Sequence, residues 1–189
     1  MKYVTSVLVL TIICITASLL LSQVYSGTKD RIEENERIEA LKQVKRVLEG
    51  LYDNDLEEDS IMIGETKVFR GKKGGELTSI AFSSFSKKGY SGLITIMVGI
   101  DPEGSILGVQ IVSHTETPGL GTKACEEQWL GQFKGKNLDS STWKVRKDSA
   151  EGLVDEVTGA TVSSRAITEA TARGLEFFKE NADAILQGD

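Results

Sequence analysis

Hydrophobic and polar positions divide this chain into an apolar start, a charged helical stretch and a long remainder in which strand and helix patterns alternate. Residues 3–28 carry no charged side chain and are largely Val, Leu, Ile and Thr. A helix of about 20 such residues crosses a hydrocarbon core of about 30 Å. A cleaved signal peptide usually has an apolar region of only about 7–15 residues. The pattern therefore predicts a retained transmembrane helix, preceded by a short N-terminal tip, within residues 1–28.

A helical pattern follows over residues 29–50. One apolar stripe runs through the charged residues of this stretch, formed by Ile38, Leu41, Val44 and Leu48. Such a stripe is typical of a helix that buries one face, and Gly50 suits its C-terminal stop. We expect a stalk helix that continues from the membrane span, although a plain amphipathic surface helix fits the same pattern.

Strand patterns dominate the middle of the chain. Residues 67–69 and 77–85 are rich in β-prone side chains, and residues 93–100 are strongly apolar and β-branched. The next four residues, D-P-E-G, have the composition of a turn. Residues 105–113 then carry Ile106, Val109 and Ile111 as the apolar positions of a returning strand. We therefore expect a β-hairpin over residues 91–113 at the centre of a sheet.

Helical patterns return towards the C-terminus. A short helix is expected over residues 123–133, followed by a short strand at 143–145. A longer helix is expected from 162 to 186, with an apolar face formed by Ala166, Ile167, Ala170, Gly174, Leu175 and Phe178. This order of elements indicates an α+β domain over residues 51–189, with a mostly antiparallel sheet and flanking helices.

Charge and composition narrow the classes of function. The 189 residues carry a formal net charge of -6, which argues against nucleic acid as a partner because a phosphate backbone requires a basic face. Cys14 and Cys125 are the only two cysteines, and His114 is the only histidine. These counts exclude a disulfide framework and a histidine-rich metal site, and no Cys/His spacing resembles a zinc or iron–sulfur site.

Residues 155–161 read Asp-Glu-Val-Thr-Gly-Ala-Thr, and core packing does not explain them. The last four of these residues are small, and they stand where the long C-terminal helix is expected to begin. A helix N-terminus has unpaired N–H groups and a positive dipole end, so it favours a bound anion. Thr161 could cap this helix, or its hydroxyl could carry a phosphate covalently. A cap would explain one hydroxyl, but not Asp155 placed upstream of Thr-Gly-Ala-Thr.

Other patterns suggest different chemistry. Residues 119–124 fit the dinucleotide fingerprint G-x-G-x-x-A, but Pro118 precedes them and the sequence around them lacks the βαβ context of that fingerprint. The loop 119–121 could instead hold a small ligand in a membrane-anchored sensor domain. His114 could serve as the base of a Ser or Thr nucleophile in a hydrolase. A loop histidine with one backbone hydrogen bond is the plainer alternative, and no third catalytic member is recognisable.

Two segments carry a resemblance to a known family. Asp155-x-x-Thr158-Gly159-Ala160-Thr161 matches the D-x-x-(S/T)-G-A-T flavinylation motif, and residues 99–104 and 114–121 resemble the same family's central hairpin and loop. With its one N-terminal anchor, the chain resembles the flavoprotein G subunits of Rnf-type ferredoxin:NAD⁺ oxidoreductases. It is also similar to the C subunits of sodium-translocating NADH:quinone reductases.

The resemblance implies covalent FMN, linked through its phosphate to the hydroxyl of Thr161. Asp155 would belong to the motif that a flavin transferase recognises. The turn presented to this enzyme would comprise Thr158, Gly159 and Ala160. The loop expected to line the flavin comprises Glu116, Thr117, Leu120, Gly121, Thr122 and Lys123. Ser163 and Ser164 could add hydrogen bonds to the phosphate oxygens, and the helix N-terminus would stabilise their charge.

The function that the resemblance implies is electron transfer within a membrane redox complex that transports Na⁺ or H⁺, with the other membrane subunits as partners. The span carries no charged residue, so the ion path is expected elsewhere in the complex. In the family the soluble domain faces the periplasm or the cell exterior, which leaves the N-terminal tip in the cytoplasm. The positive charges after the span, from Lys29 to Arg46, by themselves favour the opposite orientation. We follow the resemblance on this point.

Overall fold

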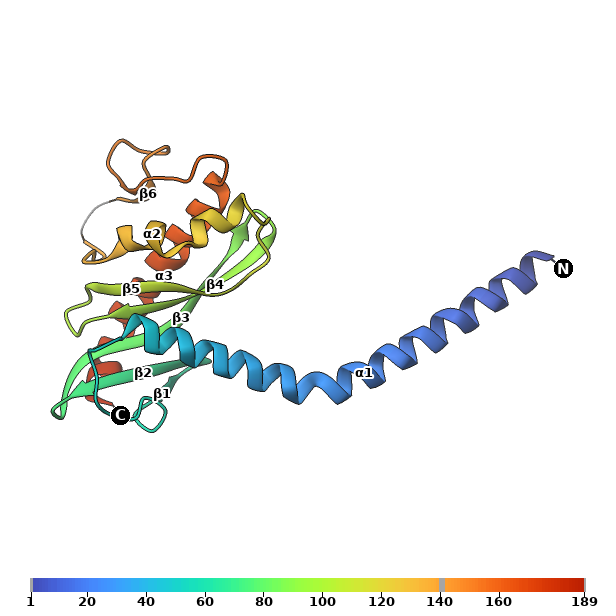
Figure 1. The fold of residues 1–189 in the computed structure, drawn as a ribbon, viewed down its shortest axis with the longest axis horizontal. Coiled ribbons are helices and arrows are strands. Elements are labelled where there is room, and N and C mark those ends of the chain that lie inside the picture. Colours follow the sequence, from blue (N-terminus) through green and yellow to red (C-terminus); the bar gives the residue numbers. More distant parts are fainter. Residues whose placement is uncertain (1, 140–141, 189) are drawn as a thin grey trace. The chain divides into compact units, whose positions relative to one another are not determined.

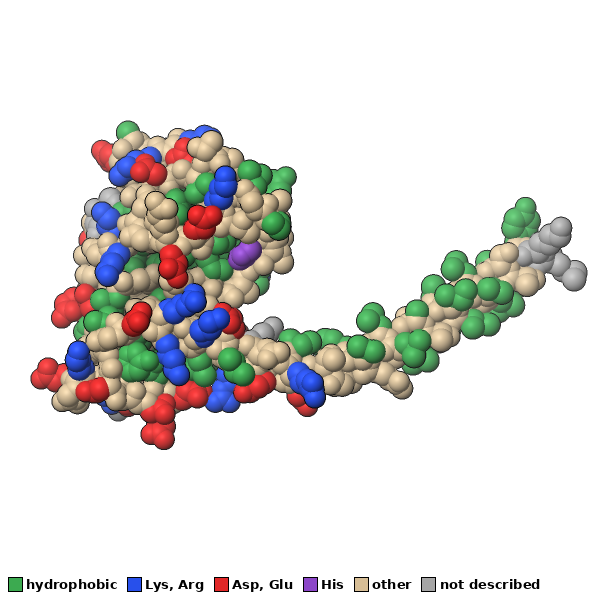
Figure 2. Space-filling view, viewed as in Figure 1, with side chains coloured by type: hydrophobic (Ala, Val, Ile, Leu, Met, Phe, Trp, Pro, Cys, Tyr) green, Lys and Arg blue, Asp and Glu red, His purple; other side chains and the backbone are tan. Residues whose placement is uncertain are grey.

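The computed structural model describes residues 2–139 and 142–188 (Figure 1). Helix α1 runs from Lys2 to Val47, and its apolar part has a mean hydropathy of 2.5 and is exposed along its length. Apolar side chains cover this first part of α1, whereas charged side chains appear only further along the helix (Figure 2). Among the described residues, α1 is the one helix that is long and apolar enough to cross a membrane.

The chain divides into two compact units, residues 1–39 and 40–189. The last two turns of α1 belong to the second unit, in which Val44 and Leu48 are fully buried. Helix α1 ends at Val47, and Gly50 follows with a left-handed φ of 74°. The apolar stripe expected from the sequence is therefore buried at its C-terminal end.

In the described residues, five strands form one antiparallel sheet in chain order. They are β1 (Ile61–Ile63), β2 (Thr66–Lys73), β3 (Glu76–Gly89), β4 (Gly92–Ile100) and β5 (Ile106–His114). The expected hairpin is confirmed as β4 and β5, whose register pairs Val98 with Val109. Its expected place at the centre of the sheet is wrong, because β5 is the edge strand of the order β1-β2-β3-β4-β5. Asp101 closes the turn between them, because its Oδ1 accepts a hydrogen bond from the Ser105 amide at 2.7 Å.

The sheet lies between helix α3 (Thr161–Gln187) and the end of α1 within residues 40–189 (Figure 1). The α3 face that the sequence predicts is buried at Ala166, Ile167, Ala170, Gly174, Leu175 and Phe178. A Cβ at Gly174 would lie 3.3 Å from Val98, so glycine brings α3 close to the sheet. On the opposite face, a Cβ at Gly99 would lie 3.0 Å from the Cβ of Val47. Helix, sheet and helix thus form three layers, and the α+β fold class is confirmed.

The prediction of one continuous helix over residues 123–133 is wrong. Three short pieces replace it, namely the 3-10 helix η1 (Gly121–Cys125), α2 (Glu127–Leu130) and the 3-10 helix η2 (Gly131–Phe133). Glu126 is extended between the first two, with φ -74° and ψ 141°. A continuous helix would place Phe133 about 180° around its axis from Ala124, at about 100° per residue. Both side chains are fully buried, and the break allows both to face the core.

A second sheet pairs β6 (Thr142–Val145) with β7 (Gly152–Val154) in parallel. The strand expected at 143–145 is confirmed as β6. The sequence pattern does not predict β1 or β7, each of which is three residues long. The β6–β7 connection matters for the site, since it brings residues 146–148 towards the start of α3.

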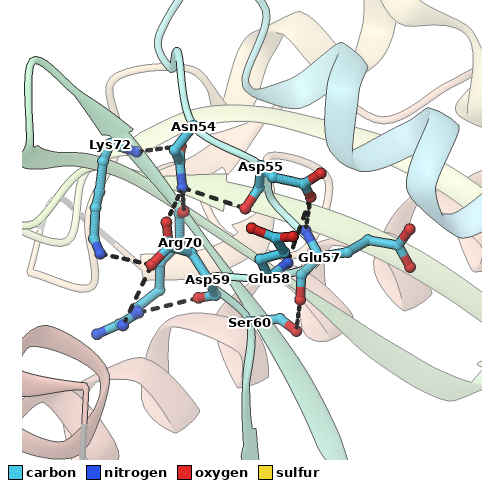
Figure 3. Close-up of polar contacts among 8 residues, drawn as sticks. All are labelled: Asn54, Asp55, Glu57, Glu58, Asp59, Ser60, Arg70 and Lys72. Carbon is cyan, nitrogen blue, oxygen red and sulfur yellow. Dashed lines mark hydrogen bonds and ion pairs between the residues drawn. The ribbon is translucent and has the colours of Figure 1, made fainter.

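A polar cluster fastens the loop between α1 and β1 to strand β2 (Figure 3). Asp59 accepts hydrogen bonds from Lys72 Nζ and from Asn54 Nδ2, each at 2.6 Å. Asn54 Nδ2 also donates to the Arg70 carbonyl at 2.9 Å. The hydrogen bond from Lys72, followed by that from Asn54, holds the pKa of the Asp59 carboxyl below its ordinary value of 3.8. We call these four residues the Asp59 cluster.

Candidate functional site

Glu116 joins three segments that are far apart in the sequence. Its side chain is only 4% exposed. Oε1 accepts a hydrogen bond from the Ser91 amide in the β3–β4 turn at 3.1 Å. Oε2 accepts one from Ser163 Oγ in the first turn of α3 at 2.5 Å. The loop that follows β5 is thereby fixed to the helix start at which the Asp155–Thr161 motif ends.

Gly121 makes this close approach possible. A Cβ at this position would lie 2.6 Å from Glu116 Oε2 and 3.1 Å from Ser163 Oγ, so a larger residue would displace the carboxylate. Leu120 reaches the motif itself, because its Cδ1 would lie 3.1 Å from a Cβ on Gly159. Gly159 has a left-handed φ of 83°, a conformation that favours glycine. The expected flavin loop and the Thr-Gly-Ala-Thr turn are therefore in contact.

The loop also has internal hydrogen bonds. Thr122 Oγ1 accepts from the Gly119 amide at 2.9 Å, and the Thr117 carbonyl accepts from the Leu120 amide at 3.2 Å. Thr117 and Lys123 are exposed, whereas Thr122 is half-buried. The structure thus brings Glu116, Leu120 and Gly121 against the motif, while the side chains of Thr117 and Lys123 face solvent.

The helix start does not use the hydroxyl of Thr161 as a cap. Ala160 occupies the cap position, and no side chain among the described residues makes a capping hydrogen bond there. Thr161 is instead the first helical residue, and it is half-buried. Ser164 stabilises the turn over residues 157–160. Its Oγ accepts a hydrogen bond from the Val157 amide at 3.1 Å and donates one to the Ala160 carbonyl at 3.0 Å. Capping therefore does not account for Thr161.

Ser163 and Ser164 are buried and already have protein partners. Ser163 Oγ donates to Glu116, and Ser164 Oγ bonds to the backbone of the preceding turn. Hydrogen bonds from these hydroxyls to a phosphate remain a prediction. In this arrangement they hold the surroundings of Thr161 in place.

The connection between β6 and β7 supplies charge beside the motif, which the sequence analysis does not foresee. Lys147 Nζ donates to Thr161 Oγ1 at 3.4 Å. Arg146 Nη1 pairs with Asp155 Oδ1 at 2.7 Å. Asp148 pairs with Arg165, one turn after Thr161, with Nε and Oδ2 at 2.7 Å. The Arg165 hydrogen bond lowers the pKa of the Asp148 carboxyl. Because fourteen residues separate Lys147 from Thr161, only the tertiary fold reveals their contact.

Asp155 is anchored through its backbone and exposes its carboxylate. Its amide donates to Gln132 Oε1 at 2.9 Å, and its carbonyl accepts from Trp129 Nε1 at 2.6 Å. Its side chain is 63% exposed and meets Arg146. Thr158 and Gly159 are exposed as well. The motif therefore forms an ordered turn whose outer surface is accessible to another protein.

A groove of about 470 Å³ lies between the first turns of α3, strand β6 and the end of β3. It is lined by Lys88, Trp143, Lys144, Val145, Asp148, Arg165, Thr168 and Glu169. Two of its cations are paired with carboxylates of the same groove, Arg165 with Asp148 and Lys88 with Glu169. The groove is shaped by the two ion pairs that connect α3 to β3 and to the β6–β7 connection.

The other polar groups of the region have structural roles. His114 Nδ1 accepts a hydrogen bond from the Glu116 amide at 3.2 Å, which is the single backbone contact of the plainer alternative, although His114 is the last residue of strand β5 and not part of the loop. Burial, together with the charges of Glu116 and Glu126, raises the pKa of the Cys125 thiol to about 11. Within residues 2–139 and 142–188, no group of three or more His, Cys, Asp or Glu residues could hold a metal ion.

Comparison with known proteins agrees with this geometry. A family model described as an FMN-binding domain matches residues 89–176, which include the loop, the turn and the start of α3. The G subunit of an ion-translocating oxidoreductase complex from Vibrio vulnificus is 35% identical over 187 residues, covering 92% of this chain and 87% of that protein. The G subunit of the complex of the same name from Stutzerimonas stutzeri is 38% identical over 161 residues, covering 79% of this chain and 69% of that protein.

Solved structures show a similar fold. The crystal structure of Shewanella oneidensis NqrC has a TM-score of 0.52 and 26% identity, covering 72% of this chain and 76% of that chain. The C subunit of the Na⁺-translocating NADH-quinone reductase from Parabacteroides distasonis also has a TM-score of 0.52, at 21% identity and 62% coverage of both chains. The second likeness concerns the fold alone.

Proposed function

The chain belongs to the family of G subunits of ion-translocating oxidoreductase complexes, and we propose that it carries FMN linked through the phosphate to Thr161. It is an electron-carrying flavoprotein subunit of a redox-driven ion-translocating complex. The FMN supplies the redox chemistry, and the protein fixes its position. The linkage to a threonine, and the ferredoxin:NAD⁺ oxidoreductase as the complex concerned, are the parts that we propose.

The observation that carries the proposal is the environment of the Thr161 hydroxyl. It lies at the start of a 27-residue helix, takes no capping role and accepts a hydrogen bond from a lysine. A phosphodiester there retains one negative charge, which a helix N-terminus stabilises by about 0.3–1 kcal/mol. The loop fixed by Glu116 borders the same turn and supplies the residues expected to line the flavin, namely Glu116, Thr117, Leu120, Gly121, Thr122 and Lys123.

Attachment requires a transferase and an activated donor. The Thr161 oxygen forms a bond to the flavin phosphorus of a flavin dinucleotide, the phosphoanhydride bond of the dinucleotide breaks, and adenosine monophosphate leaves. The hydroxyl proton passes to a base of the transferase. The exposed turn at Thr158 and Gly159, together with the carboxylate of Asp155, is the surface that this enzyme would recognise. A covalent link then prevents loss of the cofactor outside the cell.

The membrane arrangement follows from α1. We propose that residues 1–28 form the cytoplasmic tip and a single transmembrane span, residues 29–50 a stalk, and residues 51–189 an FMN-binding domain on the periplasmic or extracellular side. The span carries no charged residue, so the path of Na⁺ or H⁺ belongs to other subunits. Protease accessibility tests the orientation, because an extracellular domain is cleaved in intact cells and a periplasmic one once the outer membrane is opened, in both cases without lysis of the inner membrane.

Mass spectrometry tests the linkage directly. The full chain is co-expressed with a flavin transferase, and the peptide containing Thr161 is expected to gain the mass of an FMN ester. Thr161→Ala is expected to abolish the addition, whereas the control Thr158→Ser keeps it. An adduct that persists in Thr161→Ala, or its absence from the wild-type peptide, contradicts the proposal.

Two alternatives give different results. A subunit of a Na⁺-translocating NADH:quinone reductase carries the same adduct, and only the partner subunits recovered with the chain distinguish it. A membrane-anchored sensor that binds a small ligand at residues 119–121 carries no covalent flavin. Flavin fluorescence that remains with the denatured chain in a gel excludes the sensor.

A further inference from the structure

The cationic side chains around Thr161 differ in what they face. Arg146 is paired with Asp155, and Arg165 with Asp148. Lys147 lies between Arg146 and Asp148 in the chain. Its ammonium group donates to the Thr161 hydroxyl instead of pairing with either of their carboxylate or guanidinium partners. The two neighbouring charges are neutralised by carboxylates, and the charge of Lys147 is aimed at the atom proposed to carry the phosphate.

We propose that Lys147 is a positioning residue that pairs with the phosphodiester on Thr161. This inference rests on the proposed function and adds one residue to it. The ammonium group already lies 3.4 Å from Oγ1, and the non-bridging phosphate oxygens are attached to the phosphorus that this oxygen would bind. A lysine suits this task because its ammonium is a compact charge with three donors on a flexible stem, so it can follow the oxygens as the hydroxyl becomes an ester.

The structure holds Lys147 in place from both sides. The Arg146 amide donates to the Val154 carbonyl at 2.9 Å, and the Asp148 amide donates to the Val145 carbonyl at 2.9 Å. The side chain of Asp148 ties the connection to Arg165 on α3. The segment that carries Lys147 is therefore fastened to β7 and to the helix that carries Thr161. These contacts hold the backbone of Lys147 near that of Thr161, while the lysine side chain stays flexible.

The test measures how much the covalent flavin stabilises the protein. Thermal midpoints of the full chain in detergent are compared with and without co-expressed transferase, and loading is checked by mass. Flavinylation is expected to raise the midpoint in the wild type. Lys147→Gln is expected to reduce this rise by about 2 °C, as fits one exposed ion pair in a chain of this size. Lys147→Arg is expected to keep most of it.

A distant lysine provides the control. Lys179 is exposed on α3, 18 residues after Thr161 and so about 27 Å along the helix, well beyond the Debye length of about 8 Å at 0.15 M salt. Lys179→Gln removes the same charge and is expected to keep the wild-type rise. High salt is expected to shrink the difference between wild type and Lys147→Gln, because salt screens an exposed ion pair.

Each outcome separates this inference from the proposed function. An unloaded wild type contradicts the proposed function. A loaded Lys147→Gln with the full rise, or a wild type with no rise, overturns the role of Lys147 and leaves the linkage intact. If Lys147→Gln is not loaded, loading of Lys147→Arg supports the need for charge at this position. Failure of both variants to load, with the wild type loaded, overturns it.

Discussion

Two carboxylates, Glu116 and Asp59, each join segments that are distant in the sequence, but they do so with different partners. Asp59 is surrounded by cations, with Lys72 at 2.6 Å and Arg70 at 4.0 Å, and its side chain is 27% exposed (Figure 3). Glu116 is only 4% exposed and accepts from two neutral donors, the Ser91 amide and the Ser163 hydroxyl. The carboxylate of the first cluster is paired with cations, whereas that of the second is not.

The difference explains how the site keeps a cation for the proposed phosphate. A buried carboxylate needs its hydrogen bonds, because removing a partner leaves a desolvated group unsatisfied. Glu116 obtains these bonds from neutral groups next to the start of α3, where a negative charge is favourable. Lys147 therefore does not have to neutralise Glu116, and its ammonium group remains directed at Thr161. At the Asp59 cluster, in contrast, the lysine and the arginine both face the carboxylate.

The largest expected effect comes from Glu116→Ala. The change removes the acceptor of the buried Ser163 hydroxyl and of the more accessible Ser91 amide, so it should lower the free energy of unfolding by about 2–3 kcal/mol. Glu116→Gln keeps the size and one acceptor, and should lose about half as much. Urea unfolding of the full chain in detergent, followed by tryptophan fluorescence, measures both. A Glu116→Ala protein as stable as the wild type would show that these bonds do not hold the loop.

Gly121→Ala tests the same contact without changing charge. The added Cβ would lie 2.6 Å from Glu116 Oε2 and 2.9 Å from Glu116 Cβ, so the loop has to shift. Overpacking of this kind costs about 1–3 kcal/mol, and we expect a loss near the middle of that range in the same urea experiment. Gly131→Ala is the control, because a Cβ there has no atom within 4 Å among the described residues and its φ of -56° suits alanine. Equal midpoints for the two variants would contradict the prediction.

The sequence predicts the sheet and the long helix well, and the site only in part. The hairpin of β4 and β5 and the buried face of α3 follow from periodicity that extends over many residues. Glu116, Gly121 and Thr161 carry a motif, so the resemblance identifies them. Lys147 and Ser91 enter the site only through contacts made by the folded chain, and their local sequence has no distinctive signal. The same reason hides β1 and β7, which are three residues long and depend on their neighbours.

Asp59→Asn tests the carboxylate that is paired with cations, and the effect of this change on stability should depend on pH. At neutral pH we expect a loss of about 1 kcal/mol, since Lys72 keeps a hydrogen bond but loses its ion pair. The folded pKa of Asp59 is depressed, so this stability is present above the unfolded value and disappears as pH falls through the folded one. The gap between wild type and variant should therefore close below about pH 4.

The control for Asp59 is Asp183→Asn, an exposed aspartate on α3. Its urea midpoint is expected to follow the wild type at neutral pH and on acidification alike, because the substitution changes a side chain on the exposed side of the helix. A gap between wild type and Asp59→Asn that widens on acidification would have the wrong sign for a depressed pKa. A gap that does not change with pH would mean that the Asn54 hydrogen bond, rather than the ion pair, accounts for the stability of the cluster.

The smallest expected effect belongs to Lys88, which joins β3 to α3 by an ion pair with Glu169 at 2.8 Å. Its side chain is 76% exposed, and such pairs contribute about 0.5 kcal/mol or less. Lys88→Gln should therefore shift the urea midpoint far less than Glu116→Ala. Each change removes one contact between a carboxylate and its partner that joins another segment to α3. The Ser86 hydroxyl still donates to Glu169 at 2.9 Å in the variant. A loss from Lys88→Gln as large as that from Glu116→Ala would mean that charge, rather than burial, determines how firmly these segments are held to α3.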